Sequence, residues 1–171
     1  MKVQLVPVTQ ERMFYIAANL RARDAQEIFC TRWTEDPAAL TDEMMYVVGR
    51  PTSMSVIATF NGFPAAALGA AEPWPGLWEV WAFGTDDFDH VAFTLTKYTR
   101  RVLLPALLQR GVRRMQCRSM VGHTKAHDWL RSFGARQDDE RALKGWGKNG
   151  EDFIMFELHR EDLLKRYTEA A

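Results

Sequence analysis

The 171-residue chain has little cysteine, no excess of either charge and no long apolar run. Its cysteines, Cys30 and Cys117, form neither a C-x-x-C pair nor a zinc-site spacing, so we expect reduced thiols and no metal site. Lysine plus arginine and aspartate plus glutamate both total 22, which excludes a strongly basic or acidic chain. No apolar stretch approaches the roughly 20 residues that span a bilayer, and the N-terminal apolar run is too short for a signal peptide. We therefore expect no membrane span and no secretion through a signal peptide.

Positive charge is nevertheless concentrated in one part of the chain. Residues 94–136 contain ten cationic residues and a single anionic residue, Asp128. Such a sector can bind phosphate groups of a cofactor or a nucleic acid. More often it is a solvated face that acidic neighbours balance in space, and we favour this interpretation.

Changes in hydrophobic period along the chain predict a mixed α/β fold. Strands are predicted over residues 3–8, 55–60, 64–73, 77–83, 112–120 and 152–158, with a weaker candidate over 136–143. Helices are predicted over residues 9–20, 22–33, 37–48, 88–109, 123–133 and 159–167. The strand, long helix and strand in the middle form a βαβ crossover. We expect one domain, residues 1–171, with a mostly antiparallel central sheet flanked by helices and a polar helical tail over 159–171.

The stretch HTKAHDWLRSFGA, residues 123–135, predicts a short amphipathic helix. With the order of elements, it resembles the GNAT superfamily of N-acetyltransferases, in which the segment after the fifth strand often reads N-x-x-A-x-x-x-Y-x-x-x-G-F. Ala126 and Gly134 match this motif. Its Asn, Tyr and Phe are replaced, in that order, by His123, Leu130 and Ala135. The resemblance implies a GNAT fold and, as a candidate cofactor, acetyl-CoA.

A narrower resemblance covers three runs: FGTDDFDHVAFTLTKYTRRVLLPALLQRGVRR, RSMVGHTKAHDWLRSFGA and GKNGEDFIMFEL. These runs are similar to small GNAT-like proteins of short-tailed phages, some of which are classed as acetyltransferases. Related internal virion proteins are structural or ejected components of the particle. The resemblance implies virion proteins or further copies of the chain as partners, and the host cytoplasm or the phage virion as location.

In the GNAT fold, the pyrophosphate of acetyl-CoA binds to a glycine-rich loop between the fourth strand and the long helix. The corresponding stretch here is FGTDDFDH. The resemblance therefore implies cofactor contacts at Phe83, Gly84, Thr85, Asp86, His123 and Ala126.

The same loop carries the carboxylates of Asp86, Asp87 and Asp89. Two unit charges about 4 Å apart repel by about 4 kcal/mol at an effective dielectric of about 20. A helix terminus offers an anion only about 0.3–1 kcal/mol. Carboxylates that point into the loop would therefore oppose acetyl-CoA binding, whereas carboxylates that point outward would be helix caps. We favour the role of helix caps, and the loop makes acetyl-CoA binding doubtful.

The candidate catalytic residues are Glu79, Ser119 and His123. Glu79 is a candidate general base because the neighbouring tryptophans could desolvate its carboxylate, but we favour a carboxylate on the polar side of an alternating strand. Ser119 could bind a ligand or a leaving group, or be an ordinary strand-end hydroxyl. Leu130 stands where many GNAT proteins have a proton-donating Tyr, and it cannot donate a proton.

His123 and His127 lie one helical turn apart and could both contact a metal. No third ligand is evident, so we favour a helix cap at His123 and a surface imidazole at His127.

Three functions stay open. The first is a GNAT-fold phage protein with a degenerate acetyltransferase site and a structural or interaction role in the virion. The second is an active acetyl-CoA-dependent N-acetyltransferase of a small-molecule or protein amine. The third, nucleic-acid binding by the basic sector, is the least favoured.

Overall fold

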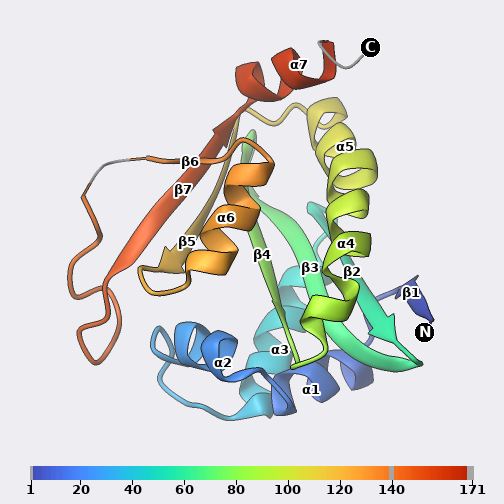
Figure 1. The fold of residues 1–171 in the computed structure, drawn as a ribbon, viewed down its shortest axis with the longest axis vertical. Coiled ribbons are helices and arrows are strands. Elements are labelled where there is room, and N and C mark those ends of the chain that lie inside the picture. The colour runs from blue at the N-terminus through green and yellow to red at the C-terminus, as the bar shows by residue number, and fades with distance from the viewer. Residues whose placement is uncertain (1, 139–140, 169–171) are drawn as a thin grey trace.

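The computed structural model describes residues 2–138 and 141–168. Within these residues, seven strands form one sheet in the order β1-β2-β3-β4-β5-β7-β6 (Figure 1). Neighbouring strands pair antiparallel, except that β4 and β5 run parallel. The predicted mixed α/β fold, with a mostly antiparallel central sheet flanked by helices, is confirmed.

The bounds of the elements follow the sequence pattern in most places. The strands are β1 (Val3–Val6), β2 (Ser53–Phe60), β3 (Phe63–Trp74), β4 (Leu77–Gly84), β5 (Arg114–Met120), β6 (Arg136–Gln137) and β7 (Phe153–His159). The helices are α1 (Gln10–Ala18), α2 (Ala22–Phe29), α3 (Pro37–Val48), α4 (Phe88–Tyr98), the π-helical turn η1 (Thr99–Leu103), α5 (Leu104–Gln109), α6 (Thr124–Ser132) and α7 (Arg160–Thr168).

Local side chains explain where several elements begin. Thr9 Oγ1 accepts a hydrogen bond from the backbone amide three residues later at 3.3 Å, which caps α1. Asp36 Oδ1 caps α3 in the same way at 2.9 Å, and Pro37 occupies the first turn. Asn61 and Gly62 form the β2–β3 hairpin turn with φ of 49° and 92°, which glycine and asparagine tolerate best.

The predicted long helix is present but not uniform. It runs as α4, η1 and α5, with the π-helical turn directly before Pro105. Proline has no amide proton and its ring collides with the carbonyl one turn earlier, so the helix widens there.

Two expectations near the C-terminus need correction. The weak strand candidate over 136–143 is a strand only at Arg136–Gln137, followed by an isolated bridge between Leu143 and Phe153; residues 139–140 lie outside the described part. The predicted C-terminal helix is present as α7, but it is not a purely polar tail, because its Leu163 is fully buried against the core. Residues 169–171 also lie outside the described part.

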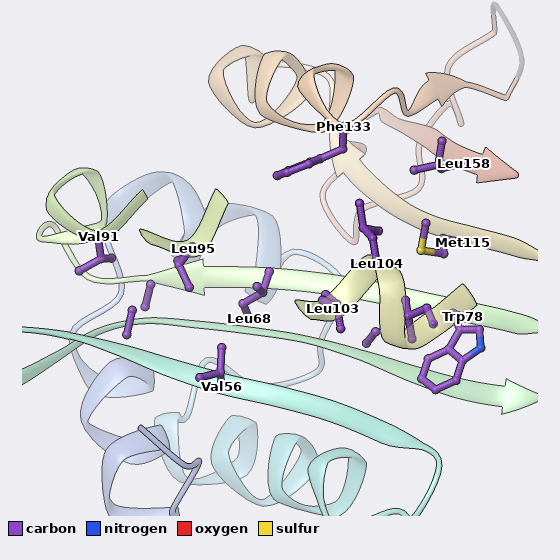
Figure 2. Close-up of a cluster of buried hydrophobic side chains, with 14 of the residues drawn as sticks. Val56, Leu68, Trp78, Val91, Leu95, Leu103, Leu104, Met115, Phe133 and Leu158 are labelled. Carbon is purple, nitrogen blue, oxygen red and sulfur yellow. The ribbon is translucent and has the colours of Figure 1, made fainter. Parts of the chain in front are cut away.

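The helices cover the two faces of the sheet in separate groups (Figure 1). Helices α1, α2 and α3 pack on one face, where Ile57 and Ala67 point towards Met13, Leu40 and other apolar side chains. Helices α4 to α6 pack on the other face. Figure 2 shows part of this second cluster, in which the labelled residues are Val56, Leu68, Trp78, Val91, Leu95, Leu103, Leu104, Met115, Phe133 and Leu158. Across the described ranges, no helix is both long and apolar enough to cross a bilayer.

Candidate functional site

A gap between β4 and β5 is the main opening in the sheet. The two strands pair in parallel only at their first residues, where Leu77–Glu79 lies beside Arg114–Gln116. Beyond Glu79 the two strands no longer pair with each other, while β4 continues beside β3 to Gly84 and β5 continues beside β7 to Met120. The unpaired halves therefore form the walls of an opening through the sheet.

This opening is a cleft of about 1350 Å³. Its walls come from both divergent strands, including Trp81 and Phe83 of β4 and Cys117 and Ser119 of β5. Residues of α2 and α3 line it on one face of the sheet, and residues of α4 and α6 line it on the other. The cleft thus has walls on both faces of the sheet, and a concave site of this kind is the usual place for a small ligand.

Asp24 of α2 holds the end of β4. The Gly84 amide donates to Asp24 Oδ2 at 2.8 Å, and Arg21 Nε lies 2.9 Å from Asp24 Oδ1. Asp24 is buried, and this burial raises the pKa of its carboxyl against the opposing effect of the Arg21 charge. The Gly84 amide at the end of β4 therefore already donates its hydrogen bond to a carboxylate of the protein.

Glu27, one helical turn later, holds the end of β5. Its Oε2 accepts hydrogen bonds from the Met120 amide at 2.9 Å and from Ser119 Oγ at 3.1 Å. His123 Nδ1 lies 2.9 Å from the same oxygen, and His123 Nε2 lies 3.6 Å from Asp24 Oδ1. The imidazole therefore sits between the two carboxylates.

We call Asp24, Glu27 and His123, with the strand ends Gly84 and Met120 that they hold, the α2 clamp. Across the diverging halves of β4 and β5, the backbone hydrogen bonds of the sheet are missing. The clamp replaces them at the strand ends with bonds from one helix, so it fixes how far the cleft opens. The buried carboxylate of Asp24 and the half-buried carboxylate of Glu27 are stable there because each is paired and accepts hydrogen bonds.

His123 lies at the predicted helix start without a capping bond, and the prediction for His127 is wrong. His123 occupies the N-cap position of α6 but makes no side-chain capping bond, because its ring is taken by Glu27. His127 was predicted on the surface and is instead buried, with Nε2 3.2 Å from Ser119 Oγ. Burial lowers its pKa, so the neutral imidazole is favoured there. In the described part of the chain, no group of three or more His, Cys, Asp or Glu side chains could hold a metal ion.

Most backbone amides of the turn between β4 and α4 donate hydrogen bonds to acceptors within the chain. Gly84 donates to Asp24 and Thr85 donates to the Ala65 carbonyl at 2.8 Å. The Asp87 amide donates to Thr85 Oγ1 at 3.2 Å, and the Phe88 amide to the Thr85 carbonyl at 3.0 Å. A fifth amide, that of His90, donates to the Asp87 carbonyl at 3.1 Å. Asp87 occupies the N-cap position of α4 as predicted, but its side chain makes no capping bond, and its own amide donates to Thr85 Oγ1.

Gly84 serves strand packing rather than an approach to a ligand. A Cβ atom at this position would lie 2.3 Å from the Ala65 carbonyl oxygen and 3.0 Å from the Ala66 Cα. Glycine is therefore required by the neighbouring strand β3, whatever the turn binds.

The remaining predicted cofactor residues spread around this turn. Phe83 is buried and lines the cleft, and Thr85 is buried beside it. Asp86 is exposed at the surface. Asp89 lines the cleft, where Lys125 Nζ lies 3.6 Å and Arg21 NH1 3.9 Å from its carboxylate. On the α6 side, His123 and Ala126 also line the cleft.

Glu79 faces the cleft from the side of α2 and α3. Its Oε1 lies 3.6 Å from Arg118 NH2 and accepts a hydrogen bond from Gln116 Nε2 at 3.4 Å. The side chain is 42% exposed, so the neighbouring tryptophans do not enclose its carboxylate. Of the three predicted catalytic residues, Ser119 and His123 both contact Glu27 Oε2 of the α2 clamp. Glu79 lies apart from them, beside Arg118.

Comparison with known proteins identifies the fold. No protein-family model matches the sequence, and no curated protein matches it. An N-acetyltransferase from Staphylococcus aureus superposes with a TM-score of 0.72 at 14% identity, covering 94% of this chain and 99% of that one. A probable acetyltransferase of the GNAT family from Chromobacterium violaceum gives 0.67 at 16%, covering 94% and 88%. The ribosomal-protein alanine N-acetyltransferase from Escherichia coli gives 0.65 at 14%, covering 92% and 94%. The chain therefore has the GNAT acetyltransferase fold, as the sequence resemblance predicted; at these identities the similarity extends to the fold alone.

Proposed function

We propose that this GNAT-fold chain does not transfer acetyl groups from acetyl-CoA, and that it acts through its cleft as a structural or interaction protein of a short-tailed phage virion. The observation that supports the first part is the turn between β4 and α4. Five of its backbone amides, those of Gly84, Thr85, Asp87, Phe88 and His90, donate to acceptors within the chain, and the acceptor of the Gly84 amide is the carboxylate of Asp24.

The residues of this turn do not fit the pyrophosphate of acetyl-CoA. Such a site needs free amides that converge on the phosphates at a helix N-terminus. Five amides between Gly84 and His90 already have acceptors inside the chain. Asp89 adds a carboxylate to the same wall of the cleft. Asp89 is largely exposed and lies 3.6 Å from Lys125 Nζ and 3.9 Å from Arg21 NH1, so these two cations partly neutralise its charge.

The α6 wall of the cleft lacks a proton donor at the motif position. Leu130 lines the cleft there and has no exchangeable proton. The hydroxyl of Ser119 and the imidazole of His123 are both bonded to Glu27. The polar groups that would manage protons therefore hold the strand ends together, which supports a structural role for this end of the cleft.

The virion role rests on the sequence resemblance to GNAT-like and internal virion proteins of short-tailed phages. Its partners would be other virion proteins or further copies of the chain. Mass spectrometry of purified particles of the phage that encodes the chain tests this part. We expect the chain in washed particles, and its absence from them would reject the virion role.

A second candidate is an acetyl-CoA-dependent N-acetyltransferase that acts on an amine. One observation favours it: the cleft still passes through the sheet, and the carboxylate of Glu79 lines it. A carboxylate in such a place is the kind of group that could accept a proton from an amine.

Calorimetric titration of the purified chain with acetyl-CoA separates the two candidates. We expect no saturable heat at millimolar cofactor, at both low and physiological salt, with an active GNAT enzyme as positive control. Micromolar binding of one cofactor per chain would reject the proposal and favour the enzyme. The next step would then be an amine-acceptor screen, in which Glu79→Gln should reduce any turnover.

A further inference from the structure

Arg118 of β5 occupies a small site in the cleft wall. Its NH2 lies 3.6 Å from Glu79 Oε1, and its guanidinium carbon lies 5.2 Å from the centre of the Trp146 ring. Trp146 belongs to the segment between β6 and β7, so the site joins two parts of the chain. All three residues line the cleft. A carboxylate and an aromatic face together form a site whose chemistry selects a cation.

Both interactions that hold Arg118 are weak. The distance of 3.6 Å is longer than a hydrogen bond, and both side chains are about two-fifths exposed, at 39% and 42%. Exposed ion pairs and exposed cation–π contacts each contribute little to stability. The guanidinium of Arg118 can therefore leave this site at low cost.

The surroundings of the site favour positive charge. Glu27 and Glu79 both face this stretch of the cleft. Burial is the main cause that raises the pKa of the neighbouring Cys117 thiol to about 12, and the charge of Glu27 contributes more to the shift than the opposing charge of Arg118. A cation at this place therefore faces two carboxylates.

We propose that the Glu79–Trp146 site binds an arginine side chain of a protein partner in place of Arg118. A planar guanidinium stacks on an indole and donates several hydrogen bonds to one carboxylate, which an ammonium group does less well. Trp33 also lines the cleft and is fully exposed, so a partner chain that enters the cleft meets a second aromatic surface there. The inference rests on the proposed interaction role and names the chemistry of the partner.

The test measures binding of a capped Gly-Arg-Gly peptide to the full chain by NMR, with the Trp146 indole signal as reporter. Analogues with lysine or uncharged citrulline replace the central residue. We expect the arginine peptide to bind at least about fivefold more tightly than lysine, and citrulline not to bind. Equal affinity for arginine and lysine, or for arginine and citrulline, would overturn the assignment.

Variants provide the matched controls. Arg118→Ala removes a competitor worth about 1 kcal/mol and should raise the affinity for the arginine peptide about fivefold. Glu79→Gln should lower the affinity more than tenfold, and Arg23→Ala, an exposed arginine of α2, should leave it unchanged. An unchanged or lower affinity in Arg118→Ala would overturn the proposal. Acetyl-CoA binding by the wild type would instead reject the proposed function, so the two failures are distinguishable.

Discussion

Replacement of Glu27 by glutamine should weaken the α2 clamp without changing the shape of the side chain. Glu27 Oε2 accepts from the Met120 amide at 2.9 Å and from Ser119 Oγ at 3.1 Å, and His123 Nδ1 lies 2.9 Å away. A bond to a charged group contributes about 1.5–3 kcal/mol and a neutral one about 0.5–1.5 kcal/mol. The loss is therefore about 1 kcal/mol per bond, and we expect Glu27→Gln to lower the free energy of unfolding by about 2–3 kcal/mol.

Urea unfolding followed by tryptophan fluorescence measures this loss, and calorimetry gives the melting temperature. At this chain length about 1 kcal/mol corresponds to about 2–4 °C, so Tm should fall by about 4–12 °C. Glu35→Gln is the matched control, because Glu35 also pairs with a cation but is 71% exposed. We expect the control to change stability by less than about 0.5 kcal/mol.

The reasoning fails if Glu27→Gln and Glu35→Gln have the same small effect. In that case the bonds between α2 and the end of β5 would contribute little, and something else would set the width of the cleft.

Two further predictions concern other parts of the sheet. Burial acts to raise the pKa of Glu157, but hydrogen bonds from His159 and Arg136 and the Arg114 charge outweigh it and hold the pKa at about 2 instead of 4.5. That shift corresponds to about 3 kcal/mol, reduced to about 2 because Arg136 is 59% exposed. The stability that comes from a depressed carboxyl pKa is complete above pH 4.5 and is lost as the pH falls towards 2. In urea titrations, Glu157→Gln should therefore lower the free energy of unfolding by about 2 kcal/mol at pH 7 and by progressively less in acid. A difference that does not depend on pH would contradict this prediction. In thermal unfolding, Gly84→Ala should lower stability by more than about 2 kcal/mol, because the new Cβ would overlap the Ala65 carbonyl. Gly122→Ala, with open space around the new Cβ, should change stability by less than about 0.5 kcal/mol. Equal effects of the two variants would show that β3 can move away from the added Cβ.

Most of the fold could be predicted from the sequence because its signals are local. The caps Thr9 and Asp36 and the Asn61-Gly62 turn fix where chain segments begin and reverse. Hydrophobic period then distinguishes strands from helices. The short β6 strand was overestimated because pairing with β7, which the sequence does not encode locally, decides its length.

The centre of the site was missed for the opposite reason. Asp24 and Glu27 look like ordinary solvent-facing residues of a short helix, and they acquire their role through partners 60 and 93 positions away. Nothing in the local pattern marks a carboxylate that a tertiary contact will bury. The same holds for His127, whose burial depends on how α6 packs against β5 and β7.

The most direct test of the account is an NMR titration of the isotope-labelled chain with acetyl-CoA, observed at the backbone amides of the β4–α4 turn. If these amides are bonded within the chain, the signals of Gly84, Thr85 and Phe88 should stay in place at millimolar cofactor, and the Gly84 amide should be protected from hydrogen exchange. Saturable shifts of these signals at micromolar cofactor, with fast exchange of the Gly84 amide in the free protein, would contradict the account.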